Sequence, residues 1–436
     1  MALSIGMISL GCTKNRVDSE QALGALKEQG YTLVSDPAQA DILLVNTCGF
    51  IESAKEESID TILEMAQYKK TGKCRLLVVT GCLAQRYHQA LLDEMPEIDV
   101  LLGVNNYNSL AAAIQEALQG RRMACCDPQL DFWEHGRVLT TPGYTAYTRI
   151  GDGCNNRCAY CAIPLIRGRY RSRPMDSILG EVAQLAAQGV REHILVAQDT
   201  TRYGTDWQAH SQLPQLMERA ALIPGVDWLR VLYCYPDETG PELLETMARH
   251  SNICKYLDLP IQHISPRLLK AMNRRGSPAQ IKATLKMARE MGFALRTSII
   301  VGFPGETEDD FKALMDFIED QRFDRLGAFT YSAEEDTPAA AMPNQIPQEL
   351  KAERLDRLMK RQAEISLAQN RKRVGETCRV LVTGREGDHY IGRSQWEAPE
   401  IDGQIHFTSQ QPHEVGQFAQ VAIRSAQTYD FTGVAL

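Results

Sequence analysis

The chain has 436 residues, a formal net charge of -8, and a composition of 44% hydrophobic and 23% charged residues. This composition is typical of a globular protein long enough for two or three domains. No apolar run approaches the ~18 residues of a membrane span, and the first residues lack a basic region and cleavage site, so we expect a cytoplasmic protein with no membrane segment. The acidic balance argues against a protein that holds nucleic acid by bulk electrostatics.

Cysteine is the most informative residue type in this sequence. The chain contains 12 cysteines, and we expect no export signal. In a reducing compartment disulfides are rare, and clustered cysteines more often bind metal or take part in chemistry. The function of this chain therefore depends on where the predicted elements place these thiols.

Strand and helix patterns alternate from residue 4 to about residue 120. The stretch M-A-L-S-I-G-M-I-S-L predicts a first strand, and the pattern after it predicts a helix with Asp18 as its N-cap and Gly30 at its end. The runs I-L-L-V-N, R-L-L-V-V-T and I-D-V-L-L predict further strands, each followed by a helix. Repeated units of this kind predict an α/β domain with a doubly wound parallel sheet over residues 1–127.

Three cysteines occupy equivalent places in this pattern. Cys12, Cys48 and Cys82 each come just after a predicted buried strand, and Cys12 and Cys82 directly follow a glycine. Because the carboxyl ends of parallel strands line one crevice, these residues can converge without any local motif. The alternative is that they are small apolar fillers, since cysteine is common in buried strands.

The central part of the chain repeats the alternation with different spacing. Pro128 and Pro142 enclose a polar stretch that predicts a linker over residues 128–141. Six apolar runs separated by helical patterns follow, which suits a partial (βα)6 version of the eight-unit barrel. We expect this domain over residues 142–370, ending in a long amphipathic helix over 348–369. The runs are Y-T-A-Y-T-R-I, H-I-L-V-A-Q, W-L-R-V-L-Y, Y-L-D-L-P-I, L-R-T-S-I-I-V and L-G-A-F-T-Y.

The last part of the chain has a third pattern. The stretches C-R-V-L-V-T-G, Y-I-G-R-S, Q-I-H-F and F-A-Q-V-A-I-R alternate apolar and polar residues and are separated by glycine-containing turns. Short strands of this kind predict a small antiparallel β-barrel over residues 371–436.

The loop after the first barrel strand reads G-C-N-N-R-C-A-Y-C and carries Cys154, Cys158 and Cys161. It is expected at the carboxyl-terminal face of the barrel, where barrel enzymes keep their chemistry, and Gly151 and Gly153 let the backbone turn sharply there. A structural zinc site or a complete ferredoxin site needs four ligands. Three thiolates would leave one iron of a cluster open to a substrate or cofactor, whereas the alternative is a zinc or redox loop.

This loop resembles the cysteine motif of the radical S-adenosylmethionine (SAM) superfamily, including aromatic Tyr160 before the last cysteine. The resemblance implies that Cys154, Cys158 and Cys161 are catalytic and hold a 4Fe-4S cluster. The open iron of that cluster would bind the amino and carboxylate groups of SAM. The reduced cluster would then transfer one electron to the sulfonium and release a 5'-deoxyadenosyl radical.

Other stretches match the same superfamily in order. A-Q-D-T-T-R-Y-G ends the second barrel strand, where Gln198 and Asp199 would meet SAM, or simply cap the strand. V-G-F-P-G-E-T resembles the glycine-rich turn beside the adenosyl group, or serves as a strand-to-helix turn capped by Thr307. In R-G-R-Y-R-S-R, Arg173 would position the SAM carboxylate, the alternative being a solvated basic loop. With Tyr160, the predicted cofactor-binding residues are Gln198, Asp199, Arg173, Gly302, Gly305 and Glu306.

The whole chain is similar to the radical SAM methylthiotransferases, which combine an N-terminal α/β domain, a radical barrel and a small TRAM-like β-barrel. The resemblance implies that Cys12, Cys48 and Cys82 hold a second 4Fe-4S cluster that carries or donates sulfur. It also implies a second SAM as methyl donor, a sulfur donor, and an electron donor such as flavodoxin or ferredoxin.

Two branches of that family fit the chain. One modifies an adenosine in tRNA, and the other modifies the β-carbon of an aspartate in small-subunit ribosomal protein twelve. The stretches S-L-G-C-T-K-N-R-V-D-S-E and D-L-P-I-Q-H-I-S-P-R-L-L-K-A-M-N-R-R-G resemble the ribosomal-protein branch. Residues 375–436 contain four arginines and eight acidic residues, which favours a basic protein partner over a phosphate backbone. An alternative from another class is a non-catalytic iron-sulfur or zinc assembly factor that binds RNA.

Overall fold

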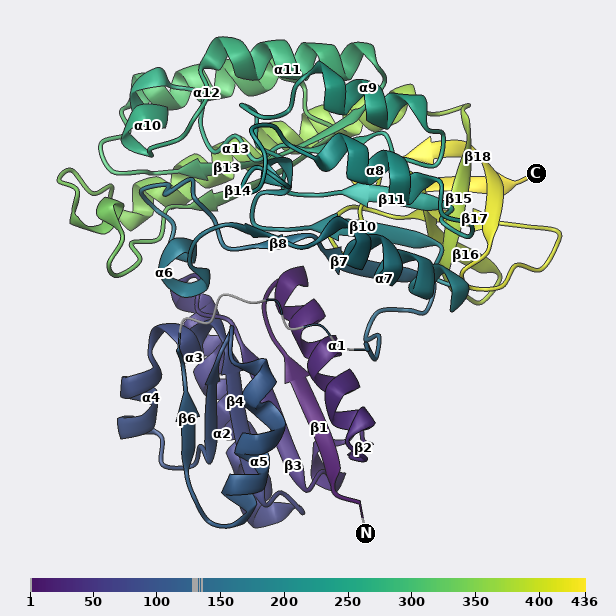
Figure 1. Cartoon of the computed structure of the whole chain (residues 1–436). Helices are drawn as coiled ribbons and strands as arrows, with labels where there is room; N and C mark the ends of the chain where they lie inside the picture. Colours follow the sequence, from purple (N-terminus) through teal and green to yellow (C-terminus); the bar gives the residue numbers. More distant parts are fainter. Residues whose placement is uncertain (1, 128–131, 133, 135) are drawn as a thin grey trace. The chain divides into compact units, whose positions relative to one another are not determined.

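The computed structural model describes residues 2–127, 132, 134 and 136–436 (Figure 1). The predicted linker over residues 128–141 therefore lies partly outside the described residues, and the predicted domain boundaries stay predictions. The chain divides into two compact units. The first unit comprises Met1–Pro142, Gly151–Arg173 and Ser332–Ala340, and the second comprises Gly143–Ile150, Pro174–Tyr331 and Ala341–Leu436.

A parallel sheet forms the centre of the first unit, with its strands in the order β2-β1-β3-β4-β5-β6 (Figure 1). The apolar runs of β3 and β4 are buried along their whole length. Such continuous apolar strands are expected where both faces of a sheet are covered. The strands are β1 (Ser4–Ser9), β2 (Thr32–Leu33), β3 (Ile42–Thr47), β4 (Leu76–Gly81), β5 (Val100–Gly103) and β6 (Met123–Cys125).

Helices cover both faces of this sheet. Helices α1 and α5 pack on one face, through side chains such as Leu26 and Ile114. Helices α2, α3 and α4 pack on the other face, through side chains such as Ile62 and Leu91. This confirms the predicted doubly wound fold. The helices are α1 (Thr13–Glu28), α2 (Glu52–Thr71), α3 (Cys82–Arg86), α4 (His88–Glu94) and α5 (Leu110–Leu118).

Helix α1 begins earlier than its sequence pattern indicates. It starts at Thr13 with Cys12 in the N-cap position, so the prediction that Asp18 is the N-cap is wrong. Asp18 lies inside the helix and is buried, and its carboxylate pairs with Arg167. The predicted helix end is confirmed, since Gly30 follows the C-cap residue with a φ of +88°.

The second unit contains six parallel strands in two sheets, β11-β10-β7 and β12-β13-β14. A parallel bridge between Leu229 and Ile253 joins the two sheets, so the strands follow one another in chain order as in a partial barrel. Each of the six predicted apolar runs overlaps one of these strands. The strands are β7 (Thr145–Arg149), β10 (Glu192–Val196), β11 (Trp228–Val231), β12 (Tyr256–Asp258), β13 (Ala294–Val301) and β14 (Arg325–Thr330).

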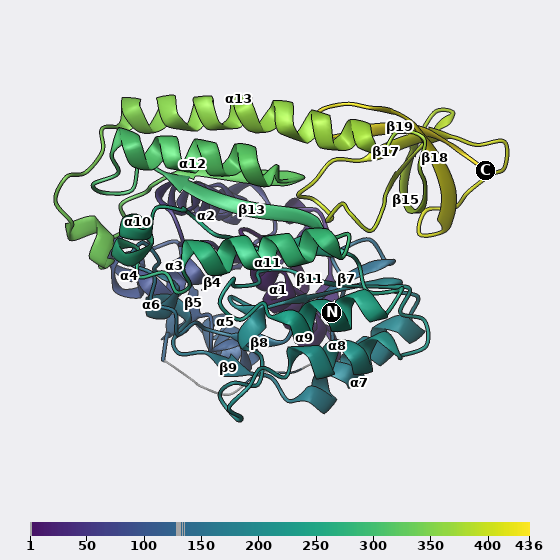
Figure 2. The same ribbon diagram turned by 90° about the horizontal axis from the view of Figure 1, so that it is seen from above.

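Helices follow the barrel strands, and the long α13 completes this part of the second unit. Figure 2 shows α13 beside α12, and it also packs on β14. The predicted helix over residues 348–369 is therefore present and extends to residue 372. The helices are α7 (Met175–Ala187), α8 (Leu213–Ala221), α9 (Pro241–Arg249), α10 (Pro266–Ala271), α11 (Pro278–Glu290), α12 (Glu308–Gln321) and α13 (Gln348–Lys372).

The C-terminal part of the second unit is a closed five-stranded barrel in the order β15-β16-β17-β19-β18. This confirms the predicted small barrel but adds a strand, because Phe431–Ala435 was not predicted. That last strand pairs parallel with β17, so the barrel is not purely antiparallel. The strands are β15 (Thr377–Glu386), β16 (His389–Arg393), β17 (Ile405–Thr408), β18 (Phe418–Ala426) and β19 (Phe431–Ala435).

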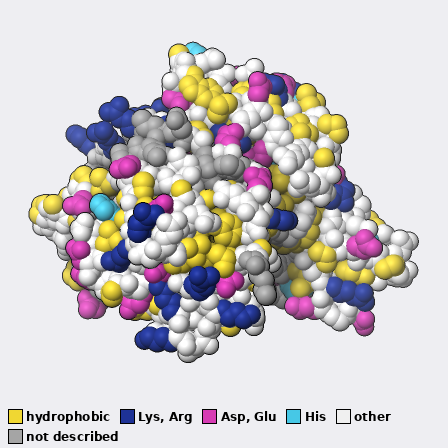
Figure 3. Space-filling model, turned by 60° about the horizontal axis from the view of Figure 1, so that its bottom comes forward, with side chains coloured by type: hydrophobic (Ala, Val, Ile, Leu, Met, Phe, Trp, Pro, Cys, Tyr) yellow, Lys and Arg dark blue, Asp and Glu magenta, His cyan; other side chains and the backbone are white. Residues whose placement is uncertain are grey.

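The surface carries both signs of charge. On the face shown in Figure 3, acidic and basic side chains occur together with groups of apolar ones. Within the described part of the chain, every helix is too short or too polar to cross a membrane.

Candidate functional site

Three cysteines lie at the same edge of the first unit's sheet. Cys12, Cys48 and Cys82 follow β1, β3 and β4, which are neighbours in the sheet. Because these strands run parallel, their carboxyl ends meet at one edge. The structure thus places these three residues where the strand pattern predicted them, and it forms no disulfide with any of them.

Glycines let the three cysteine loops approach closely. A side chain on Gly11 would place its Cβ 2.9 Å from the Cβ of Cys48, and one on Gly49 would lie 2.8 Å from the backbone nitrogen of Leu83. Gly81 has a φ of +102°, and a Cβ there would lie 2.4 Å from the carbonyl oxygen of Thr47. Only a residue without a side chain fits at such contacts.

Asn15 of α1 links the three loops. Its Nδ2 donates to the carbonyls of Leu10 and Thr47, at 3.1 and 2.9 Å, and these residues precede the first two cysteines. Its Oδ1 accepts a hydrogen bond from the Sγ of Cys82 at 3.5 Å. One buried amide therefore contacts all three chain segments that carry the thiols.

The chemistry of this donor set suits an iron-sulfur cluster. Burial raises the pKa of the Cys82 thiol to about 12, although the guanidinium of Arg167 opposes this rise, so the thiol holds its proton at neutral pH until a metal displaces it. Among the described residues, no three His, Cys, Asp or Glu side chains converge to hold a single metal ion. A cluster differs from a single ion in that its thiolate ligands bind separate irons, and three thiols on neighbouring strand ends fit that arrangement.

The second set of cysteines lies in a closed loop of the same unit. Short strands β8 (Gly151–Asp152) and β9 (Arg171–Ser172) pair antiparallel at the base of the loop. The backbone nitrogen of Cys154 donates to Gly168 at 3.1 Å, and that of Cys161 donates to Cys158 at 3.0 Å. Cys154 and Cys158 are buried and Cys161 is half-buried, so the thiols are sheltered as an iron-sulfur site requires.

Residues that follow the second thiol set pack against Cys82 of the first set. Cys82 belongs to a small apolar cluster with Val104, Ala162 and Ile166. Ala162 directly follows Cys161, and Ile166 lies in helix α6 (Ile163–Arg167). The end of the cysteine loop therefore forms part of the wall around Cys82.

The segment Ser332–Ala340 contacts both the cysteine loop and the helices of the N-terminal sheet. The nitrogen of Ala339 donates to Ala159 in the cysteine loop at 2.8 Å. Buried Glu334 binds Arg86 of α3 at 3.1 Å and Lys55 of α2 at 3.4 Å. This segment thus connects the cysteine loop to the helices of the N-terminal sheet.

Gln198 and Asp199 lie after β10 in the second unit. Both polar atoms of the Gln198 side chain are buried and have no hydrogen-bond partner among the described residues. Asp199 is buried and accepts a hydrogen bond from Thr201 at 2.5 Å. Gln198 therefore has the unmet polar atoms expected of a ligand contact, whereas Asp199 is already engaged by the protein.

The glycine-rich turn after β13 is held together by one of its own side chains. The carboxylate of Glu306 accepts hydrogen bonds from the nitrogens of Gly302 and Phe303 and forms an ion pair with Arg354 at 3.2 Å. Gly302 and Gly305 both have positive φ, at +73° and +78°. These contacts assign Glu306 to building the turn, and cofactor binding by its side chain stays a prediction.

The turn also starts helix α12 as its sequence predicts. Thr307 accepts a hydrogen bond from the nitrogen of Asp310, and Asp310 accepts one from the nitrogen of Thr307. This reciprocal capping box confirms the predicted N-cap at Thr307.

Arg173 and Tyr160 lie in the first unit. Arg173 is buried and its Nε donates to Glu134 at 2.5 Å. Tyr160 lies in the turn between Cys158 and Cys161 and is half-buried. Their contacts with SAM remain predictions.

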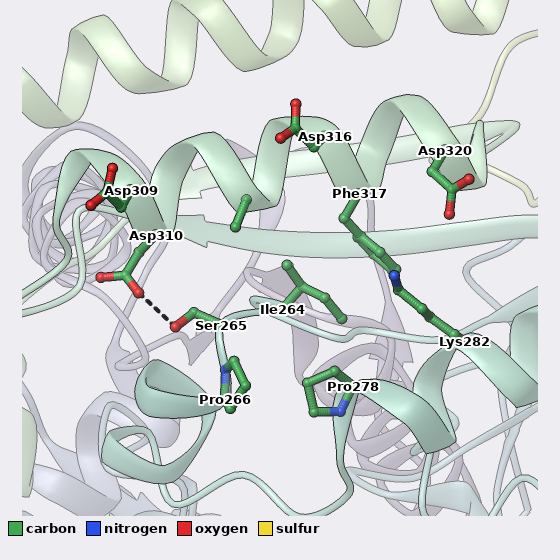
Figure 4. Close-up of a pocket in the computed structure, with 11 residues that line it drawn as sticks. Ile264, Ser265, Pro266, Pro278, Lys282, Asp309, Asp310, Asp316, Phe317 and Asp320 are labelled. Carbon is green, nitrogen blue, oxygen red and sulfur yellow. Dashed lines mark hydrogen bonds between the residues drawn. The ribbon is translucent and has the colours of Figure 1, made fainter.

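A cavity of about 690 Å³ opens between helices α11 and α12 of the second unit (Figure 4). Acidic side chains of α12 line one side, and Lys282 of α11 lies on the other. Asp310 is occupied there by a hydrogen bond from Ser265 at 2.6 Å. None of the predicted cluster or cofactor residues lines this cavity.

The sequence patterns did not predict two residues of the first unit that contact a candidate cluster ligand. Asn15 and Arg167 both contact Cys82, the first at 3.5 Å and the second at 3.8 Å from its sulfur. Arg167 is the first residue of R-G-R-Y-R-S-R, but charge crowding alone does not distinguish it from Arg173. Asn15 lies three residues after Cys12 on what becomes a helix, and its partners come from other strands.

Three family matches cover most of the chain. Residues 4–103 match the uncharacterized protein family UPF0004, residues 148–318 match the radical SAM superfamily, and residues 374–436 match the TRAM domain. A solved structure of the radical SAM methyltransferase TsrM from Kitasatospora setae has a TM-score of 0.57 at 16% identity, with 76% of this chain and 75% of that chain covered. That likeness shows the fold alone. Together these matches define the class as a radical SAM protein with a C-terminal TRAM domain.

Full-length relatives narrow the class. The chain is 53% identical to the ribosomal protein uS12 methylthiotransferase RimO of Desulforamulus reducens, with 99% of each chain covered. It is 47% identical to the RimO of Clostridium acetobutylicum, with 99% of this chain and 98% of the relative covered. The chain belongs to the RimO family of radical SAM methylthiotransferases.

Proposed function

We propose that this protein converts a C–H bond to C–SCH3 at the β-carbon of an aspartate in ribosomal protein uS12, using two 4Fe-4S clusters and SAM. The observation that carries the proposal is the presence of two sets of three cysteines in one compact unit. Full-length similarity to proteins named uS12 methylthiotransferases supports the substrate.

Each thiol set has its own role in this proposal. Cys154, Cys158 and Cys161 would hold the cluster that binds SAM, and Cys12, Cys48 and Cys82 would hold the second cluster. When bound, the first cluster supplies the electron that cleaves SAM to the radical that removes the hydrogen, the second supplies sulfur, and another SAM supplies the methyl group. The chain's own residues bury Cys82, Cys154 and Cys158, and Ala162 and Ile166 after the second cysteine set pack against Cys82.

The C-terminal barrel is proposed to dock the substrate protein. Two of its four arginines are engaged by carboxylates of the second unit, because Arg379 binds Asp227 at 2.6 Å and Arg393 binds Glu192 at 2.6 Å. These pairs compensate two of the four positive charges of the barrel. A barrel with this charge balance favours a basic ribosomal protein over the phosphates of tRNA.

The test uses anaerobically reconstituted protein with a reductant, SAM, sulfide and either uS12 or tRNA. Mass spectrometry should find one methylthio group replacing hydrogen on a uS12 aspartate. A methylthio group on tRNA adenosine instead would contradict the proposed substrate. Failure of the loaded protein to cleave SAM would favour the binding-protein alternative.

Two cysteine variants separate the roles of the clusters. C154A/C158A/C161A should lose SAM cleavage, whereas C12A/C48A/C82A should still cleave SAM but transfer no methylthio group. Each triple variant should bind about half the iron of the unchanged protein, as expected for one thiolate-held cluster out of two. C74A offers a matched control, because Cys74 is a buried thiol of the same unit that donates to Leu76 and belongs to neither set.

A further inference from the structure

Arg167 is a fully buried cation beside the N-terminal thiols. It is 1% exposed and is the last residue of helix α6, which follows the cysteine loop. Its Nη2 lies 3.8 Å from the Sγ of Cys82 and 2.6 Å from the Oδ1 of Asn15. The same guanidinium therefore contacts a predicted cluster ligand and the amide that links the three cysteine loops.

Two carboxylates hold this guanidinium in place. Asp18 of α1 accepts from Nη2 at 2.9 Å, and Asp152 of β8 accepts from Nη1 at 3.1 Å. Both carboxylates are at most 3% exposed. The planar fork of arginine suits several fixed acceptors at once, which an ammonium group cannot match. A buried charge with these partners is held at one position and is screened little by water.

We propose that Arg167 is a positioning residue that sets the reduction potential of the N-terminal cluster and orients its Cys82 ligand. The inference rests on the proposed second cluster at Cys12, Cys48 and Cys82. Cluster potentials depend on net charge and on hydrogen bonds to the sulfur ligands. Arg167 supplies both, because its positive charge and its N–H group favour the more negative, reduced state. Asp18 opposes this effect with a negative charge on the same guanidinium.

Removing the positive charge of Arg167 and removing the negative charge of Asp18 should shift the midpoint potential in opposite directions. The test is a redox titration of the full-length protein, followed by electron paramagnetic resonance, in a C154A/C158A/C161A background that leaves only the N-terminal thiol set. Arg167→Gln should shift the midpoint potential to more negative values, and Arg167→Lys should shift it less. Asp18→Asn should shift it to more positive values. General disruption of the site would not shift the midpoint potential in opposite directions in Arg167→Gln and Asp18→Asn.

A matched control comes from another ion pair of the first unit. Arg137 pairs with Glu20 of α1, and both side chains are at most 3% exposed. Arg137→Gln removes the same charge from a buried pair with Glu20 rather than from the guanidinium beside Cys82. It should leave the midpoint potential unchanged.

The outcomes separate this inference from the proposed function. A parent protein that binds no cluster in this background would reject the second cluster and the inference together. A cluster whose potential responds equally to Arg167→Gln and Arg137→Gln, or moves in the same direction in Asp18→Asn, would reject the inference alone. If Arg167→Gln fails to retain the cluster, the comparison of Arg167→Lys with the isosteric Asp18→Asn decides.

Discussion

Arg393 of the C-terminal barrel donates to the carboxylate of Glu192 at 2.6 Å, and Glu192 is the first residue of barrel strand β10. Glu192 is completely buried and also accepts from Arg230 at 3.1 Å. A second, partly buried link joins Tyr256 of β12 to Asp402 at 2.6 Å. The small barrel is thus joined to the strands of the second unit by buried and partly buried polar contacts.

Arg393→Ala should destabilise the second unit. Removing one partner of a buried ion pair leaves the other charge poorly compensated, which costs about 3 kcal/mol even though Arg230 remains. The measurement is denaturant unfolding followed by tryptophan fluorescence, since Trp228 lies edge-on to Phe418 of the small barrel. Arg385→Ala is the control, because Arg385 is exposed and donates to the carbonyl of Gly387, at 2.9 Å, rather than to a buried carboxylate; it should change stability by less than about 0.5 kcal/mol.

The ionisation of Glu192 should also make the stability of the second unit sensitive to acid. Burial opposes its ionisation, but the guanidiniums of Arg393 and Arg230 outweigh burial and lower the pKa of Glu192 to about 2. The contribution to stability is therefore complete above the unfolded pKa of about 4.3 and is lost as pH falls towards 2. When the pH falls from 5 to 2, the free energy of unfolding should decrease by about 3 kcal/mol less in Glu192→Gln than in the unchanged protein. Parallel acid profiles for the two proteins would contradict this assignment.

Gly81→Ala should disturb the N-terminal thiol site. The new Cβ would meet the carbonyl oxygen of Thr47 at 2.4 Å and the Oδ1 of Asn46 at 2.4 Å, in a backbone conformation with φ of +102°. Positive φ and overpacking together should cost about 3 kcal/mol and lower the iron bound by Cys82 and its neighbours. Gly120→Ala is the matched control, because Gly120 has a φ of +86° but nothing within 4 Å of the new Cβ. It should cost about 1 kcal/mol and leave iron content unchanged.

The positions of Cys12, Cys48 and Cys82 could be predicted because they depend on local patterns and on one topological rule. Apolar runs identify the strands, and parallel order brings the strand ends to one edge. The position of the capping residue was predicted wrongly for α1. Asp18 has the sequence features of an N-cap, but a partner 149 residues away, Arg167, holds it inside the helix.

Long-range partners also explain the other differences. Asn15 contacts Leu10, Thr47 and Cys82, and no short sequence window contains all four residues. The strand Phe431–Ala435 was not predicted, and its parallel partner β17 lies more than 20 residues earlier. Cofactor binding by Glu306 stays a prediction, and its carboxylate also accepts hydrogen bonds from the backbone of its own turn.

Gln198→Leu should separate stability from cofactor binding. The amide of Gln198 is buried with no hydrogen-bond partner among the described residues, so replacing it with an apolar side chain of similar size removes a desolvation cost. The cofactor-free protein should be at least as stable as the unchanged one. SAM affinity should fall about tenfold, because a hydrogen bond to a bound ligand contributes about 1.4 kcal/mol.

The control for this prediction is the neighbouring carboxylate. Asp199 is engaged by Thr201 and lies 3.7 Å from Arg202, so Asp199→Asn should lower the stability of the cofactor-free protein. Thermal unfolding without SAM and calorimetric SAM titration of the reconstituted protein measure the two effects. A Gln198→Leu protein that is less stable but binds SAM with unchanged affinity would show that the amide serves the fold. The opposite pattern, unchanged stability with weaker binding, is expected because an unpartnered buried amide gains its hydrogen bonds only when a polar ligand is present.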